Sequence, residues 1–88
     1  MTTSDQLTRL ARDIISPEQA RHVLHAYGSP GGYQAGSFTT NLIACFQTAD
    51  PHNFATLSRS YPGYGAAVTL AREHQNGIAV LQIIAAGS

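Results

Sequence analysis

A glycine-rich loop over residues 27–37 divides this chain and restricts how it can fold. Four of the eight glycines of the chain lie within it. Glycine gathers where the backbone turns sharply or where another group must approach it closely. The segments on both sides of the loop have helical periodicity, so we expect it to join two helical parts. It is also the first candidate for a functional site.

Start signals and apolar spacing predict two helices before the loop. The apolar side chains of the first helix recur at helical intervals: Leu7, Leu10, Ala11, Ile14 and Ile15. Thr3 and Gln6 have the spacing of a capping box at its start. The second start signal places Ser16 as the cap, Pro17 at the first helical position and Gln19 three residues after the cap. This helix is expected over residues 17–27, before Gly28 ends it.

Three more helices are predicted after the loop. Ser37 is expected to cap a helix over residues 38–48, and Asp50 before Pro51 repeats the cap-and-proline signal. Pro62 is expected to end the fourth helix, and a fifth covers residues 64–74. The side chains expected to face inward are Phe38, Leu42, Cys45, Phe46, Ala49, Phe54, Leu57, Tyr61, Tyr64, Ala67, Val68 and Ala71.

The apolar C-terminal segment is ambiguous in form. Asn76 and Gly77 can end a helix or make a hairpin turn, but no alternating strand precedes them. We expect residues 78–86 to form a short helix, with a strand as the alternative. The segment is apolar on nearly every side, so it must be buried in the core or against another subunit. The sequence therefore predicts an all-α fold: a compact bundle of about five short helices, plus this segment, in one domain over residues 1–88.

The low charge of the chain bears on its partners. Charged residues make up 11% of it, no lysine is present and the formal net charge is zero, whereas ordinary domains carry roughly 25% charged residues. A folded monomer usually keeps a charged coat for solubility. We therefore expect a homo-oligomer in which other copies cover part of the surface. Binding to nucleic acid is not expected, because the basic face that neutralises phosphates is missing.

The sequence features that report on location favour the cytoplasm. The first residues are polar and carry no signal-peptide pattern. No apolar stretch is long enough for a membrane span, so no membrane association is expected. Cys45 is the single cysteine and cannot form an intrachain disulfide, which fits a reducing compartment.

The loop has the four-residue glycine spacing of a phosphate-binding loop between Gly31 and Gly36, but not its chemistry. The required lysine is absent, and the loop follows a helix instead of a strand. These differences argue against a nucleotide hydrolase. The amides near Ser37 could still receive a phosphate oxygen at the start of a helix, and Tyr33 could stack on a ring. The alternative is a loop that only turns the chain.

Metal binding and catalysis find little support in the sequence. Glu18, His22 and His25 share one helix face at a spacing that could hold zinc, but no fourth ligand is evident. We expect this face to be solvated. Cys45 is expected to be buried and inert, and no catalytic triad or carboxylate pair can be assembled. The prediction is therefore no metal, no cofactor and no enzymatic activity.

A second patch with the composition of a binding surface is Arg59 with Tyr61 and Tyr64, although both tyrosines could instead lie in the core. The predicted ligand-binding residues are Tyr33, Gln34, Gly36, Ser37, Arg59 and Tyr64. In this hypothesis, the loop and Arg59 hold a phosphate-bearing ligand together, at the boundary between two subunits if the chain is an oligomer.

From Tyr33 to about Ala71, the chain resembles a type of small helical protein carried by tailed phages and prophages. The resemblance rests on Gly36-Ser37-Phe38-Thr39, Leu42-Ile43, Ala49-Asp50, Asn53, Leu57, Pro62 and Ala67-Val68. Those proteins usually have phenylalanine before the proline, where this chain has Tyr61. The resemblance covers under half of the chain. It implies a helical fold and a phage accessory role, such as blocking a host protein or sequestering a signalling nucleotide, and it supplies no catalytic residues.

The sequence as a whole predicts a small non-enzymatic binding protein. It would sequester a phosphate-bearing small ligand, such as a signalling nucleotide, or occlude a host protein. One alternative is a structural protein that assembles through its apolar C-terminus. The other is a helix-turn-helix DNA binder built from the first two helices, although the joint at Ser16-Pro17 is shorter than the usual turn.

Overall fold

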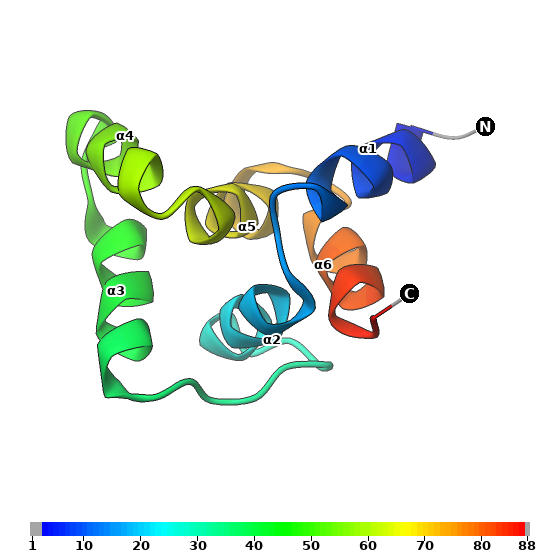
Figure 1. Cartoon of the computed structure of the whole chain (residues 1–88), viewed down its shortest axis with the longest axis horizontal. Helices are drawn as coiled ribbons and strands as arrows, with labels where there is room; N and C mark the ends of the chain where they lie inside the picture. Colours follow the sequence, from blue (N-terminus) through cyan, green and yellow to red (C-terminus); the bar gives the residue numbers. More distant parts are fainter. Residues whose placement is uncertain (1–2, 88) are drawn as a thin grey trace.

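The computed structural model describes residues 3–87, with side chains from Asp5 onward, and its fold is all-α. Within this range the chain forms six helices and no strand (Figure 1). Their bounds are α1 Thr3–Arg12, α2 Pro17–Ala26, α3 Ser37–Thr48, α4 Pro51–Ser60, α5 Pro62–Glu73 and α6 Gly77–Ala85. None of these helices has the length and apolarity of a membrane span.

Helices α2, α5 and α6 pack against one another and form the centre of the molecule. α1 lies against α6, α4 lies against α5, and α3 contacts both α2 and α5. Figure 1 shows α3 and α4 at one end and α1 and α6 at the other, while the glycine-rich loop runs beside α2 to reach α3. The loop therefore runs alongside the helix it follows.

The core is aliphatic, with one large aromatic ring. Phe46 of α3 is fully buried and meets Phe54 of α4 edge to face, with 5.3 Å between the ring centroids. The other large side chains that are fully buried are Ile15, Val23, Leu24, Ile43, Val68, Val80, Leu81 and Ile84. Most of them come from the central helices, which explains why those helices hold the fold together.

Two predicted helix starts are confirmed in atomic detail. The Ser16 hydroxyl accepts a hydrogen bond from the Gln19 amide at 3.1 Å, and the Gln19 side chain accepts one from the Ser16 amide at 2.9 Å. Asp50 caps α4 by accepting a hydrogen bond from the Asn53 amide at 2.8 Å. Each proline follows its cap at the first helical position. The predicted box at the first helix involves Thr3, whose side chain lies outside the described residues.

The predictions for α3 were wrong about its cap and only partly right about its inward face, where Leu42 and Phe46 are buried as expected. Gly36 is the cap and makes no side-chain hydrogen bond, while Ser37 is already helical. Phe38 is 66% exposed and Cys45 is also exposed, whereas Ile43 is buried. The helix is rotated so that Ile43 and Phe46 meet α2 and α5. An apolar stripe is broad enough to permit either rotation, and the packing partners select one of them.

The predicted inward stripe of the first helix is also only half correct. Ala11 and Ile15 are buried, but Leu10 is 67% and Ile14 is 52% exposed. Thr8 is buried in their place. Because α1 packs on α6 along one edge, the other edge of its apolar stripe remains uncovered.

The junction between α4 and α5 differs from the prediction by a few residues. Pro62 begins α5 instead of only ending α4, and Tyr61 is both the last cap of α4 and the first cap of α5. Tyr61 is 37% exposed, and α4 has no fully buried residue. Phe54 and Leu57 reach the core from its edge. α4 is thus a helix on the surface, packed on α5.

The C-terminal segment is a helix, as expected, and lies at the centre of the fold. α6 buries Val80, Leu81, Ile84 and Ala85 against the rest of the chain. Asn76 lies before its first residue, so Asn76-Gly77 starts this helix and makes no hairpin. The burial that an apolar segment requires is therefore met within a single copy of the chain.

Candidate ligand-binding site

The glycine-rich loop leaves α2 at its end and then crosses back over the same helix. Gly28 ends α2 in the left-handed conformation, with φ of 67°, which glycine adopts at little cost. The Tyr33 amide then donates a hydrogen bond to the Arg21 carbonyl at 3.3 Å, and the Gln82 side chain of α6 donates one to the Pro30 carbonyl at 3.0 Å. The loop is thus fastened to α2 and to α6.

Gly32 lies at the point where the loop touches the helix. A Cβ atom at this position would overlap the Arg21 carbonyl oxygen and the His25 amide nitrogen. Both atoms belong to the backbone of α2 and cannot move aside. The loop can therefore lie on α2 only with glycine here, and this close approach accounts for part of the glycine enrichment.

Crossing the helix places Tyr33 beside two side chains of α2. The Arg21 guanidinium carbon lies 6.0 Å from the centre of the Tyr33 ring, and the His22 ring meets it edge to face with 5.5 Å between centroids. The tyrosine nevertheless remains 47% exposed. It therefore offers an accessible aromatic surface next to a guanidinium and an imidazole.

His22 also connects α2 to α5 through Tyr64. The Tyr64 hydroxyl and the His22 Nδ1 atom are 2.8 Å apart, and the two rings stack with 6.2 Å between centroids. Burial raises the pKa of Tyr64 above its ordinary value, and a hydrogen bond with the Thr39 side chain opposes that rise. The sequence analysis placed His22 on a solvated face, but it is half-buried. Because Nδ1 is occupied by Tyr64, Nε2 is the ring nitrogen left for a ligand.

A polar pocket opens beside His22, between α2, α3 and the loop. Its volume is about 320 Å³. The polar side chains that line it are His22, His25, Gln34, Thr40 and Gln47. Its apolar wall consists of Ala26, Ala35, Ile43 and Ala44. Few convergent polar groups in a concave apolar wall are typical of a small-molecule site.

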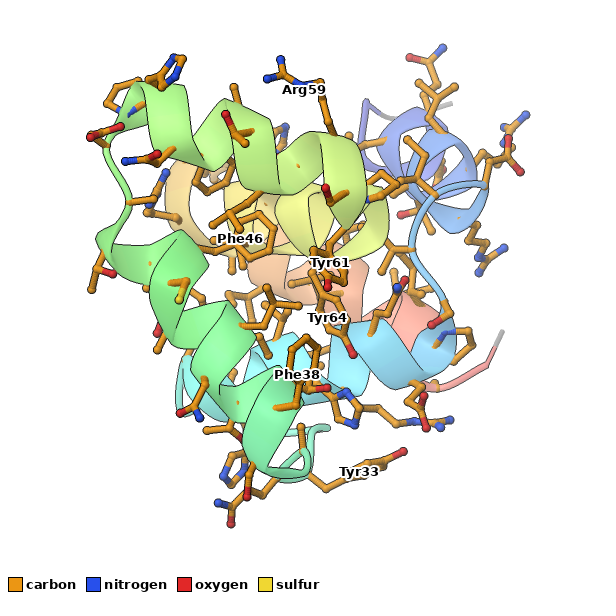
Figure 2. All side chains as sticks on the ribbon, turned by 60° about the vertical axis from the view of Figure 1, so that its left-hand side comes forward. Tyr33, Phe38, Phe46, Arg59, Tyr61 and Tyr64 are labelled. Carbon is orange, nitrogen blue, oxygen red and sulfur yellow. The ribbon has the colours of Figure 1, made fainter. Side chains whose placement is uncertain are left out.

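The structure brings together some of the predicted site residues and separates one of them. Gln34 lines the pocket, while Tyr33 and Tyr64 both contact His22. Gly36 and Ser37 are exposed at the start of α3, between the pocket residues Ala35 and Thr40. Arg59 does not take part: it lies on α4, its guanidinium is 3.4 Å from the Thr56 hydroxyl, and Figure 2 shows it at the opposite end of the view from Tyr33.

Sequence reasoning missed the histidines and the α3 wall as parts of one site. The sequence analysis considered Glu18, His22 and His25 as possible zinc ligands and did not connect them with the loop. Among the described residues, no three His, Cys, Asp or Glu side chains are grouped as a metal ion would require. A usable signal existed on α3, because Thr40, Ala44 and Gln47 recur at helical spacing as a small and polar stripe.

Two other exposed groups lie outside this pocket. Phe38 and Tyr61 form an aromatic pair on the surface, with 6.3 Å between ring centroids (Figure 2). Cys45 lines a separate hollow at the junction of α3 and α4, where the sequence analysis expected a buried thiol. Neither joins the cluster around His22.

No protein-family model, curated protein or solved structure matches this chain. The resemblance to helical phage proteins therefore stays a prediction.

Proposed function

We propose that this chain is a small non-enzymatic binding protein that sequesters a phosphate-bearing small ligand in the pocket between α2, α3 and the loop. The observation that carries the proposal is the convergence of two imidazoles, two amides and one hydroxyl on a single hollow. All of these groups form hydrogen bonds to oxygen or nitrogen atoms of a ligand. The site differs from the sequence hypothesis in replacing Arg59 with His22 and His25.

The size of the pocket limits the ligand. Small-molecule pockets span roughly 300–1,000 Å³, and this one, at about 320 Å³, is at the small end. It suits one phosphate-bearing group of mononucleotide size or smaller. Tyr33 lies next to His22 and has an exposed ring, so a base or another planar group could stack there. The resemblance to phage proteins would make sequestration of a host signalling nucleotide one setting for this activity.

Assembly of copies of this chain is the second candidate function, and it would use a different surface. The predicted contact through the C-terminus loses its rationale, because α6 is buried within the chain. The exposed apolar surface lies on α1 and the turn after it instead, where Leu10 and Ile14 flank an apolar groove against α5. DNA reading by α2 has less support, since α2 packs against three helices and carries the loop across it.

Native mass spectrometry of protein purified from cells without refolding tests the proposal first. A retained mass of nucleotide size, reduced in His25→Gln and Gln34→Ala, is the expected result. His52→Gln is the matched control, because His52 is an exposed histidine on α4, outside the pocket. A chain without any bound molecule that also fails to bind a panel of nucleotides and phosphate esters would contradict sequestration.

A further inference from the structure

The polar pocket contains no permanent positive charge. Neither arginine nor lysine lines it, and lysine is absent from the whole chain. Arg21 lies on the Tyr33 side of His22, and its Nε donates a hydrogen bond to the Ala85 carbonyl at the end of α6, at 2.8 Å. His22 and His25 are the only titratable side chains among the lining residues. An anion in this pocket can therefore meet a full positive charge only on an imidazole.

From this arrangement we infer that the pocket takes up its anion together with protons on His22 and His25, so that the ligand is released as the pH rises. This inference rests on the proposed function and specifies how the same site is regulated. It also restricts the ligand to an anion, because the binding of a neutral molecule would gain nothing from the added protons.

The hydrogen bond between His22 and Tyr64 allows His22 to gain a proton without losing its partner. When the neutral imidazole carries its proton on Nε2, the Tyr64 hydroxyl donates to Nδ1 across the 2.8 Å contact. With a charged imidazole, Nδ1 donates to the Tyr64 oxygen instead. In both states Nε2–H can donate to a ligand, and only the charged state adds electrostatic attraction.

The charged and titratable groups around this histidine come from three elements. On α2, Glu18 lies one turn before His22 and Arg21 lies next to it, while Tyr33 comes from the loop and Tyr64 from α5. Glu18 is the one carboxylate among them, and its charge acts on the Tyr64 hydroxyl. The pocket and cluster residues from α3 are Thr39, Thr40, Ile43, Ala44 and Gln47, none of which is charged. Imidazole is the side-chain type that in general changes charge between about pH 5 and pH 8, and His22 and His25 supply the imidazoles of this cluster.

Inorganic sulfate is the appropriate probe, because its charge stays constant between pH 5 and pH 8. Its dissociation constant can be measured at pH 5.5, 6.5 and 7.5 by NMR titration, with the side-chain amides of Gln34 and Gln47 reporting binding in the pocket. Linkage predicts that affinity falls by up to about tenfold per pH unit for each proton taken up with the anion. His25→Gln should weaken binding and flatten its pH dependence. His52→Gln and His74→Gln should behave like the unaltered protein.

The possible outcomes separate this inference from the proposed function. Sulfate affinity that falls with rising pH in the unaltered protein, and falls less steeply in His25→Gln, supports both. Equal sulfate affinity at the three pH values overturns the proton coupling and leaves sequestration standing. If neither sulfate nor adenosine monophosphate shifts the Gln34 and Gln47 signals at pH 5.5, both proposals are overturned. The His25 side chain is exposed and makes no hydrogen bond among the described residues, and its backbone carbonyl still accepts from the Gly28 amide after substitution, so His25→Gln should leave the fold intact.

Discussion

The polar pocket beside α2 and the apolar groove beside α1 have the same volume, about 320 Å³ each, but more polar side chains line the pocket. The groove is lined by Leu7, Leu10, Ala11, Ile14, Ile15, Ser58, Gly65, Ala66, Thr69 and Leu70. The Thr69 hydroxyl already donates a hydrogen bond to the Gly65 carbonyl at 2.8 Å. The groove therefore offers apolar contact area and few groups for hydrogen bonds. The pocket offers several side chains that can form directional hydrogen bonds with a ligand.

This difference shows that volume does not identify a site here, and that close backbone packing and side-chain polarity are more informative. The chain accepts a glycine-only contact at Gly32 to bring Tyr33 and Gln34 against α2. Nothing comparable holds the groove, which results from α1 covering only part of its own apolar stripe. Two pairs of matched substitutions, one pH series and one double substitution on the surface can test the distinction.

Gly32→Ala should have the largest effect, because its added methyl group collides with the backbone of α2. We expect a loss of about 2–3 kcal/mol in the free energy of unfolding, together with weaker ligand binding as Tyr33 and Gln34 move. Gly36→Ala is the control, since no atom lies within 4 Å of its Cβ position and its φ is −66°. Urea unfolding measures the free energy of unfolding of both variants. Equal losses in the two variants would mean that the loop does not rest on the helix.

Two tyrosine substitutions should act in opposite directions. Tyr64→Phe removes the hydroxyl that pairs with His22 and should cost about 1 kcal/mol of stability. The Tyr27 hydroxyl is buried without a hydrogen-bond partner among the described residues. Tyr27→Phe should therefore be neutral or stabilising by up to about 1 kcal/mol. Thermal unfolding of the two variants compares them directly. A larger loss of stability in Tyr27→Phe than in Tyr64→Phe would contradict this account, in which the Tyr64 hydroxyl stabilises the fold and the Tyr27 hydroxyl does not.

Alkaline pH should lower the stability of the protein through the ionisation of Tyr64. The folded-state pKa of Tyr64 is raised above the ordinary value of 10.0, mainly by burial. The folded protein therefore holds this proton more tightly than the unfolded chain, and stability must fall as the pH rises above 10. Tyr64→Phe should show a shallower fall across the same range in chemical denaturation. An identical slope in both proteins would show that the Tyr64 ionisation is not coupled to folding.

The sequence predicted the parts of the molecule that depend on local chemistry. The caps at Ser16 and Asp50 each need only a hydroxyl or carboxylate three residues before an amide, so they could be recognised directly. The rotations of α1 and α3 about their own axes could not be predicted in this way, because the partner helices decide which edge of a broad apolar stripe is covered. Leu10 and Phe38 are exposed for this reason.

In the candidate site, too, residues close together in the sequence could be predicted and residues far apart in the sequence could not. Tyr33 and Gln34 could be proposed because the loop itself is unusual in sequence. The pairing of His22 with Tyr64 joins residues 42 positions apart, and no spacing rule connects them. Arg59 was included on composition alone, although the structure places it near Thr56 and away from Tyr33. Groups that meet through tertiary packing could not be assembled from one sequence.

The smallest expected effect is on stability when the groove is made polar. Leu10→Gln combined with Ile14→Gln should change the free energy of unfolding by no more than about 0.5 kcal/mol, because both side chains are more than half exposed. Ile83→Gln is a matched control, since Ile83 is an exposed isoleucine of α6 outside the groove. Sedimentation equilibrium then decides what the groove does. Dissociation of an oligomer in the double variant alone would make the groove the contact between copies. An unchanged mass in every variant would show that the groove has no part in assembly. A change in ligand affinity in the double variant would show that the polar pocket and the apolar groove are not independent.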